Sequence, residues 1–262
     1  MSCKYYEELK ILSVGNSFSV DTMEHLANIA LNVGFKKVKL GNLFIGGCSI
    51  NKHYNNAMND IGEYKYYVNN GEGWSCTENF KSSDAIKSEE WDIISIQHGT
   101  KDGSRYTSAE SYEKLPALID YVKSLAPNAK IAFNMAWVSN PDGKHHEIRS
   151  YNGDQMLMYK NLLEITQTVV KPIPTLDIVS PTGTAVQNAR TTDIADTLLR
   201  DGFHLSYMIG RYIGGLTFLK ALTGAPIDSI TWAPEGVGEH EMKIAVAAAN
   251  AAIEKPFEIT NL

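Results

Sequence analysis

Ser17 is the first residue whose position could support chemistry. It lies in Lys10–Ser19, KILSVGNSFS, where an apolar run predicts a short buried strand and Gly15-Asn16 predicts a sharp turn. A serine at a strand-to-helix turn projects its hydroxyl from the strand end and keeps its own N–H among the unpaired donors of the helix, which suits a nucleophile. The alternative is that Ser17 or Ser19 only caps the helix that follows.

A second candidate group, Asp201-Gly202-Phe203-His204, lies near the other end of the chain. A serine hydroxyl needs a base at neutral pH; a histidine can be that base, and a carboxylate can fix the histidine's tautomer. Because Asp201 and His204 are three residues apart on one loop, the carboxylate can contact one ring nitrogen while the other faces Ser17. The alternative is a solvent-exposed turn beside a helix cap.

The elements that must bring these groups together alternate between strand and helix. Strands are predicted at 11–14, 37–44, 93–96, 129–135 and 172–178, and helices at 20–32, 50–61, 109–125, 151–170, patches of 180–199, 207–222 and 238–253. This order predicts an α/β fold, a three-layer α/β/α sandwich around about five parallel strands, in a single domain over residues 1–262. Two aromatic-rich runs about a glycine turn near 64–80 predict an inserted hairpin, either a substrate flap or decoration.

Glycine-rich and polar loops follow the second and third strands, where open α/β sheets place their chemistry. Gly46-Gly47 could direct an N–H at a substrate oxygen or simply form a tight turn. The histidine of the 50–61 helix, His53, is expected at the surface. The neighbouring His145 and His146 stand on a loop without the spacing pattern of a metal site, so neither a metal nor a cofactor is predicted.

Composition narrows the class of protein. The 262 residues are 44% hydrophobic and 21% charged, with a net charge of -6, which predicts a globular chain with a sizeable core. Without a lysine or arginine stripe, nucleic acid is not an expected partner. The three cysteines form no CxxC pair, and no apolar run is long enough for a membrane helix or a signal peptide. We therefore expect no membrane partner and a cytoplasmic location, or a secreted or periplasmic one if a native leader has been removed; no residue pattern predicts the oligomeric state.

Four segments together resemble the sequence blocks of the SGNH (GDSL-type) hydrolase superfamily. They are Gly15-Asn16-Ser17-Phe18-Ser19, Gly46-Gly47, Gln97-His98-Gly99-Thr100 and Asp201-Gly202-Phe203-His204-Leu205. The resemblance runs from about Lys10 to Leu222, and the GNSFS first block is similar to that of an uncharacterised bacterial branch. It implies a flavodoxin-like SGNH hydrolase fold, with Ser17 as nucleophile, His204 as general base and then acid, and Asp201 as the orienting carboxylate.

The resemblance also implies an oxyanion hole made of the N–H groups of Ser17 and Gly47 and one side-chain amide. The usual third block is G-x-N-D, but this chain has Lys101 where asparagine is expected. Some carbohydrate-esterase branches use a Gln-Gly type segment instead, so Gln97 is the first candidate for the amide donor, with His98 and Lys101 behind it. The first block departs as well, having Asn16 where aspartate is usual.

The substrate is predicted from the loops. Polar and aromatic residues, Trp74, Tyr106, Trp137 and His145, suit the faces of a sugar better than a long acyl chain, and Trp137 and His98 are taken as substrate-binding. The sequence therefore predicts a serine esterase that removes small acyl groups, in particular O-acetyl groups, from carbohydrate. The alternatives are a lipase, thioesterase or arylesterase of the same superfamily, or a non-catalytic carbohydrate-binding protein on this fold.

Overall fold

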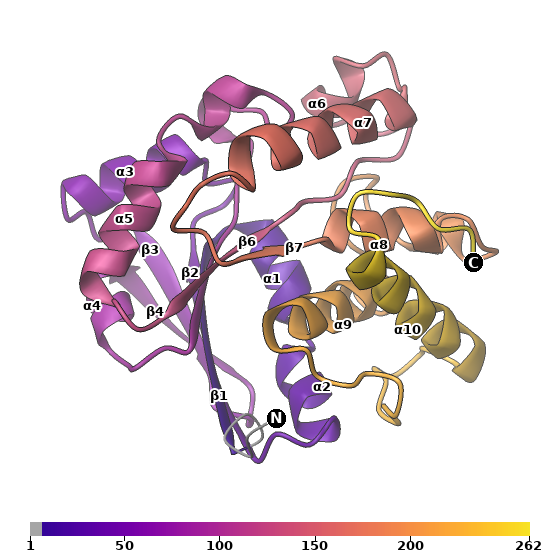
Figure 1. Ribbon diagram of the computed structural model, residues 1–262, viewed down its shortest axis with the longest axis horizontal. Coiled ribbons are helices and arrows are strands. Elements are labelled where there is room, and N and C mark those ends of the chain that lie inside the picture. The colour runs from indigo at the N-terminus through magenta and orange to yellow at the C-terminus, as the bar shows by residue number, and fades with distance from the viewer. Residues whose placement is uncertain (1–6) are drawn as a thin grey trace.

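The central feature of the fold is a seven-stranded, mostly parallel sheet in the order β4-β3-β2-β1-β5-β6-β7. The computed structural model describes residues 7–262, apart from the side chains of residues 102 and 196 (Figure 1). The strands are β1 Glu8–Gly15, β2 Lys37–Phe44, β3 Tyr64–Asn69, β4 Trp74–Phe80, β5 Ile93–Ile96, β6 Lys130–Asn134 and β7 Ile178–Ser180. Strands β2, β1, β5, β6 and β7 run parallel, and β3 and β4 add antiparallel to the β2 edge. The predicted α/β fold is confirmed.

Helices cover both faces of the sheet. One face carries α1 Ser17–Met23, α2 Leu26–Asn32, α8 Thr182–Ala189, α9 Ile209–Thr223 and α10 Glu239–Glu254 (Figure 1). The other face carries α3 Ile50–Met58, α4 Ser82–Lys87 and α5 Leu115–Leu125. Above the sheet in Figure 1 lie α6 His146–Arg149 and α7 Gln155–Ile165, which continues into the π-helical turn η4 Thr166–Val170. Short 3₁₀ turns occupy η2 Lys101–Gly103, η3 Ala109–Tyr112 and η5 Ala195–Thr197.

The first strand shows why the sheet is buried on both sides. Leu9 and Ile11 belong to the core under α1, α2 and α9, whereas Leu12 and Val14 belong to the core under α3 and α5. The period of two along a strand sends neighbouring side chains to opposite faces, so an apolar run fills both cores. At its carboxyl end this strand delivers the chain to the beginning of α1.

Four predicted elements differ markedly from those observed. The helix predicted at 109–125 is the 3₁₀ turn η3 followed by the separate helix α5, whose first turn holds Pro116. The helix predicted at 20–32 is two helices, because the chain leaves helical geometry at His25, whose ring contacts the carbonyl oxygen of Tyr207 at 2.9 Å. The strand predicted at 172–178 is β7, Ile178–Ser180, since Pro172 and Pro174 lack the N–H groups that a ladder requires. The helix predicted to begin at 151 begins at Gln155, after a cap by Asp154.

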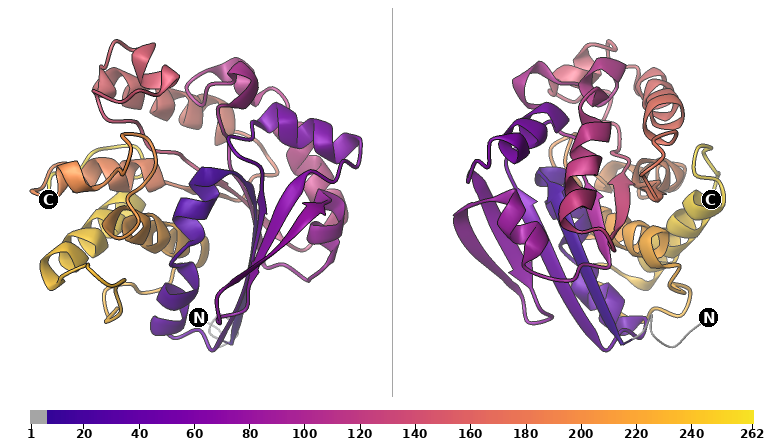
Figure 2. Two further views of the ribbon diagram at one scale, coloured as in Figure 1. Left: turned by 180° about the vertical axis from the view of Figure 1, so that it is seen from behind. Right: turned by 60° about the vertical axis from the view of Figure 1, so that its left-hand side comes forward.

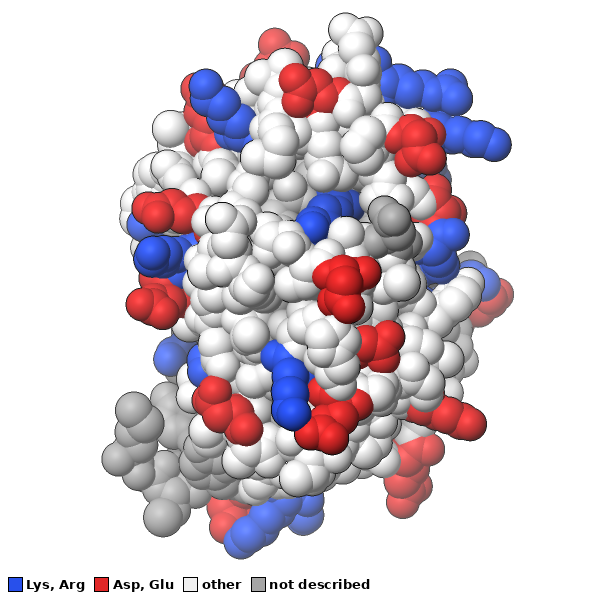
Figure 3. All heavy atoms as spheres, turned by 90° about the vertical axis from the view of Figure 1, so that its right-hand side faces the viewer, with Lys and Arg blue, Asp and Glu red and all other residues white. Residues whose placement is uncertain are grey.

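The region predicted as an inserted hairpin forms β3 and β4, which extend the sheet as its outer antiparallel edge (Figure 2). On the face shown in Figure 3, acidic and basic side chains are interspersed. Within residues 7–262, no helix combines the length and the apolar character that crossing a bilayer demands.

Candidate active site

Ser17 is the first residue of α1 and does not cap it. The cap is Asn16, whose Oδ1 accepts from the N–H of Phe18 at 2.9 Å, while Ser19 Oγ accepts from the N–H of Asn16 at 3.0 Å. The capping interpretation is therefore wrong for Ser17, although Ser19 does take part in the cap. Gly15 is required at this turn because a Cβ there would lie 2.2 Å from Ser19 Oγ. The Ser17 hydroxyl is left available for another partner.

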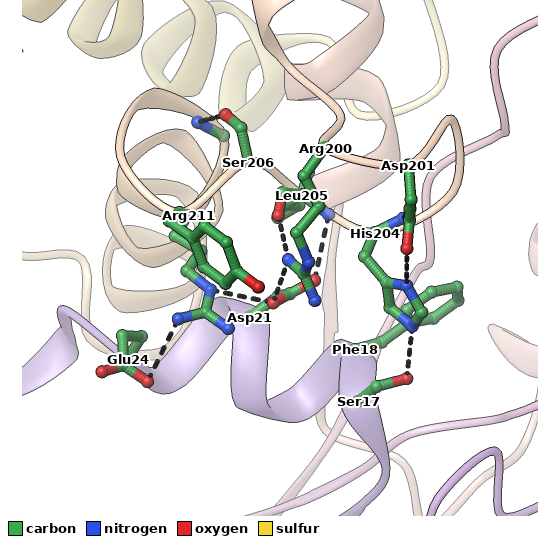
Figure 4. A network of polar contacts seen from close by, with 12 residues as sticks. Ser17, Phe18, Asp21, Glu24, Arg200, Asp201, His204, Leu205, Ser206 and Arg211 are labelled. Carbon is green, nitrogen blue, oxygen red and sulfur yellow. Dashed lines mark hydrogen bonds and ion pairs between the residues drawn. The ribbon is translucent and has the colours of Figure 1, made fainter.

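That partner is His204, 187 residues further along the chain (Figure 4). His204 Nε2 lies 2.9 Å from Ser17 Oγ, and His204 Nδ1 lies 2.7 Å from Asp201 Oδ2. The other carboxylate oxygen, Asp201 Oδ1, accepts from the N–H groups of Phe203 and His204 at 3.0 and 2.6 Å. A carboxylate on Nδ1 favours the tautomer with its proton there, so Nε2 can accept the proton of the serine.

The electrostatics of Asp201 favour an ionised carboxylate. Partial burial raises its pKa, but the hydrogen bonds from the backbone and the ring of His204 outweigh burial, and the pKa lies below the ordinary value. The turn that holds it needs glycine, because Gly202 has φ +75° and lies against Gly143. An ionised carboxylate would stabilise the imidazolium that forms when His204 takes a proton.

Aromatic side chains pack against the turn that carries Asp201 and His204. Phe18 contacts Phe203 and Trp137 with ring centroids 4.8 and 4.5 Å apart, and His145 stacks on Phe203 at 3.7 Å. Trp137 is fully buried, and its Nε1 donates to the carbonyl oxygen of Phe203 at 2.7 Å. The structure thus corrects the substrate-binding role expected for Trp137: the indole holds the loop of His204 and has no exposed face for a ligand. Tyr106 is also fully buried.

The loop after β2 lies beside the first turn of α1. Asn16 Nδ2 donates to the carbonyl oxygen of Cys48 at 3.1 Å, which explains why asparagine serves here: an aspartate could cap the helix but could not donate. Gly47 has φ +63°, and its carbonyl oxygen accepts from the N–H of Lys101 at 2.8 Å. The chain at Gly47 and Cys48 is therefore fixed both to the turn at Asn16 and to the loop after β5.

Gln97 points into the sheet and not towards an open site. Its Nε2 donates to the carbonyl oxygens of Asn134 and His98 at 3.3 and 3.4 Å, and its Oε1 accepts from Asn134 Nδ2 at 2.8 Å. Asn134 in turn accepts from Thr182. The amide that the sequence assigned to the oxyanion hole is engaged inside the protein, where it ties β5 to β6.

Two histidines behind Gly47 and Cys48 are buried. His53, expected at the surface, has no exposed area, and its Nδ1 lies 2.9 Å from the Tyr64 hydroxyl. His98, expected to bind substrate, is also fully buried, and neither of its ring nitrogens has a hydrogen-bond partner within the described part of the chain. Burial lowers the pKa of each to about 3, so both rings are neutral. The expectation that His53 is exposed is wrong, because His53 lies on the buried face of α3.

A cavity of about 410 Å³ opens beside Ser17. Its lining comes from α1, the end of β2, the hairpin and the residue before Asp201: Ser17, Val20, Glu24, Asn42, Phe44, Tyr67, Trp74 and Arg200. Of the aromatic residues selected from the sequence, Trp74 lines this cavity. Sequence reasoning missed Phe44 and Tyr67, although the alternation along β2 and the aromatic content of β3 carried a signal for them.

One group of side chains has the composition of a metal site. The donor atoms of His145, His146 and Glu147 lie within 4.8 Å of one another. Glu147 Oε1, however, accepts from the N–H and hydroxyl of Thr107 at 3.0 and 2.8 Å, and burial raises the Glu147 pKa to about 7. His145 stacks on Phe203 of the turn, so two of the three residues have structural roles.

Solved structures show the same fold. A DUF4886 family protein from Bacteroides uniformis matches with a TM-score of 0.91 and 31% identity, covering 98% of each chain. A protein from Parabacteroides merdae, assigned as a GDSL-like lipase by similarity, matches with a TM-score of 0.53 and 17% identity, and the match covers 84% of this chain and 97% of that protein's chain. Among curated proteins, no relative matches. Residues 10–252 match the family described as a domain of unknown function (DUF4886). The chain belongs to the DUF4886 family.

Proposed function

We propose that this protein is a serine hydrolase of carboxylic esters, of the SGNH (GDSL-type) superfamily. The observation that carries the proposal is the continuous hydrogen-bonded series from Ser17 Oγ through His204 to Asp201, with contacts of 2.9 and 2.7 Å. The fold shared with the GDSL-like lipase supports it, and so does the cavity beside Ser17. The cavity gives a substrate access to the hydroxyl that this series would activate.

The mechanism follows from the order of these groups. His204 Nε2 takes the proton as Ser17 Oγ attacks the ester carbonyl, and the tetrahedral intermediate collapses when the imidazolium gives that proton to the leaving alcohol. Water, deprotonated by His204, then attacks the acyl-serine and releases the carboxylic acid. The oxyanion lies at the backbone N–H groups of Ser17 and Gly47, each of which stabilises the transition state by about 3 kcal/mol. In this proposal Gln97 ties the end of β5 to β6 and does not donate to the oxyanion.

The proposed substrate is a carbohydrate that carries O-acetyl esters. Three aromatic side chains of the cavity, Phe44, Tyr67 and Trp74, offer the flat apolar faces on which sugar rings pack. In the same lining, Glu24 can accept hydrogen bonds from sugar hydroxyl groups and Arg200 can donate hydrogen bonds to them. Because the acetyl group is small, most of the 410 Å³ would hold the alcohol part of the ester.

A second candidate is an esterase for longer acyl chains. The same volume and the apolar residues Val20 and Phe44 could instead receive an acyl group larger than acetyl. A third candidate is a non-catalytic carbohydrate-binding protein, because Lys101 stands where the third block of the SGNH superfamily usually has asparagine. The experiments below separate the three.

The first experiment tests hydrolysis itself. The protein is incubated with p-nitrophenyl acetate, and Ser17→Ala is expected to lower kcat/KM by at least about 10³-fold, since the nucleophile is lost. A fluorophosphonate should label Ser17, as located by mass spectrometry. The matched control is Ser124→Ala, an exposed serine on α5, which should retain full activity. An inert wild-type protein would favour the binding module, and full activity in Ser17→Ala would contradict the assignment.

The second experiment tests the substrate. With an acetylated oligosaccharide, Trp74→Ala should raise KM by about tenfold, or roughly 1.4 kcal/mol, because a stacking face is lost, while kcat changes little. Trp74→Phe, which keeps an aromatic face, should recover most of the affinity. A preference of the wild-type protein for p-nitrophenyl esters with more than four acyl carbons would support the longer-chain esterase instead.

A further inference from the structure

A buried carboxylate outside the serine, histidine and aspartate described above connects the two halves of the site. Asp21 lies four residues after Ser17, one turn further along α1, and its side chain has no exposed area. Its Oδ1 accepts from Arg200 Nη1 and from Arg211 Nε, both at 2.9 Å, and its Oδ2 accepts from the N–H of Leu205 at 3.0 Å. Figure 4 shows Asp21 on the nucleophile's helix, pointing at the loop that carries His204.

Two of these partners are the first and last residues of the acid–base turn, which we define as residues 200–205. Arg200 directly precedes Asp201, and Leu205 directly follows His204. Arg200 Nη1 also donates to the carbonyl oxygen of Leu205, and the N–H of Arg200 donates to the carbonyl oxygen of His204 at 3.0 Å. One carboxylate therefore ties both ends of the turn to the helix that begins with Ser17.

We propose that Asp21 is a positioning residue that sets the separation of Ser17 and His204, and that it acts on turnover through this geometry rather than by contact with substrate. The inference rests on the proposed function. Asp201 orients the ring of His204 but comes from the same turn, so it cannot place that turn on α1. Asp21 comes from α1 and hydrogen-bonds both ends of the turn, so it adds directional polar contacts to the apolar contact between Phe18 of α1 and Phe203.

The charge of Asp21 suits this role. A carboxylate is a strong acceptor for N–H groups, and two guanidinium groups compensate its burial. An asparagine would keep the size but present only one strong acceptor, and it would leave the half-buried Arg200 without its anion, whereas Arg211 would keep its contact with Glu24. A shift of about 1 Å between nucleophile and base is enough to lower a rate about hundredfold.

The test compares two variants within the same ion cluster. Asp21→Asn removes the ties to the turn, and we expect kcat for p-nitrophenyl acetate to fall about hundredfold with KM within about threefold of wild type. Arg211→Met is the matched control: it removes another contact to Asp21, together with the 3.4 Å contact to Glu24, but leaves Arg200 and Leu205 in place. We expect Arg211→Met to lose at least as much thermal stability as Asp21→Asn and to keep kcat within about threefold of wild type.

These results distinguish positioning from plain structural support. Equal kcat losses in the two variants at equal losses of Tm would overturn the proposal, as would a folded Asp21→Asn with wild-type kcat. If Asp21→Asn does not fold, the double variant Asp21→Asn with Arg211→Gln, which removes one charge of each sign, is judged by the same criterion. Failure of both to fold would overturn the proposal as well, because Asp21 would then serve the whole fold. An inert wild-type protein would instead overturn the proposed function.

Discussion

The two sides of Ser17 are built by different means. On one side, the acid–base turn is held by hydrogen bonds to charged groups. Asp201 accepts three, and Asp21 accepts two from the ends of the turn and one from Arg211 of α9. On the other side, the loop of residues 45–48, which we call the oxyanion loop, is held by neutral hydrogen bonds and close backbone packing. Behind it lies the fully buried ring of His98.

Under the proposed function, the difference follows from the group that each side must offer to the substrate. A base must offer one ring nitrogen at a defined distance, and ionic hydrogen bonds orient a side chain well. An oxyanion hole made of backbone N–H groups needs only a fixed main chain, and tight packing fixes it without adding charge. The acid–base turn should therefore be sensitive to the loss of charge, and the oxyanion loop to added volume.

Of the substitutions that test this contrast, an added methyl group at Gly99 is expected to have the largest effect. A Cβ there would lie 2.5 Å from the carbonyl oxygens of both Gly47 and Cys48, so Gly99→Ala must push the oxyanion loop away. Loss of the Gly47 donor should lower kcat for p-nitrophenyl acetate about hundredfold, or roughly 2.7 kcal/mol. Steady-state kinetics on the folded variant measure this effect.

Gly46→Ala is the matched control for that substitution. It adds the same methyl group to the oxyanion loop, but the nearest atom, Phe44 Cζ, would be 3.9 Å away. Its kcat should stay within about threefold of wild type. If both variants turn over like wild type, close packing does not set the geometry of this side, and the contrast between the two sides of Ser17 fails.

Sequence patterns predicted the parts of this molecule that depend on local signals. The apolar run before Gly15 and the segment DGFHL were sufficient to select Ser17, Asp201 and His204, which the fold brings within hydrogen-bonding distance. The parallel sheet followed from the alternation of strand and helix. Both signals lie in short stretches of chain, one as a periodic apolar pattern and the other as a compact motif.

Long-range contacts escaped prediction because no local period encodes them. Asp21 occupies a helical position that a polar surface residue could fill equally well, and its partners lie 179 to 190 residues away. Gln97 and His98 follow a strand end that is open in many α/β proteins, but here the neighbouring loops cover it. Gln97 contacts Asn134 and His98 contacts Tyr112, and no pattern around residue 97 reveals these partners.

The smaller expected effect concerns the buried histidines and the pH dependence of stability. Burial lowers the pKa of His98 to about 3 from an ordinary 6.5, with the neighbouring His53 lowering it further. Between these values the unfolded chain binds a proton that the folded chain does not, so the free energy of unfolding falls as the pH falls. The stabilisation is complete above pH 6.5 and decreases by roughly 1.4 kcal/mol per pH unit below it.

His98→Leu should remove this contribution. Because neither ring nitrogen of His98 has a partner among the described residues, an apolar side chain of similar volume leaves no buried acceptor or donor unpaired. The free energy of unfolding is measured by urea denaturation between neutral pH and about pH 5. Over that interval it should fall by roughly 2 kcal/mol less in the variant than in the wild-type protein. An equally large fall in His98→Leu would mean that His98 is not the group that takes up the proton on unfolding, and that the oxyanion side tolerates its buried ring in the charged form.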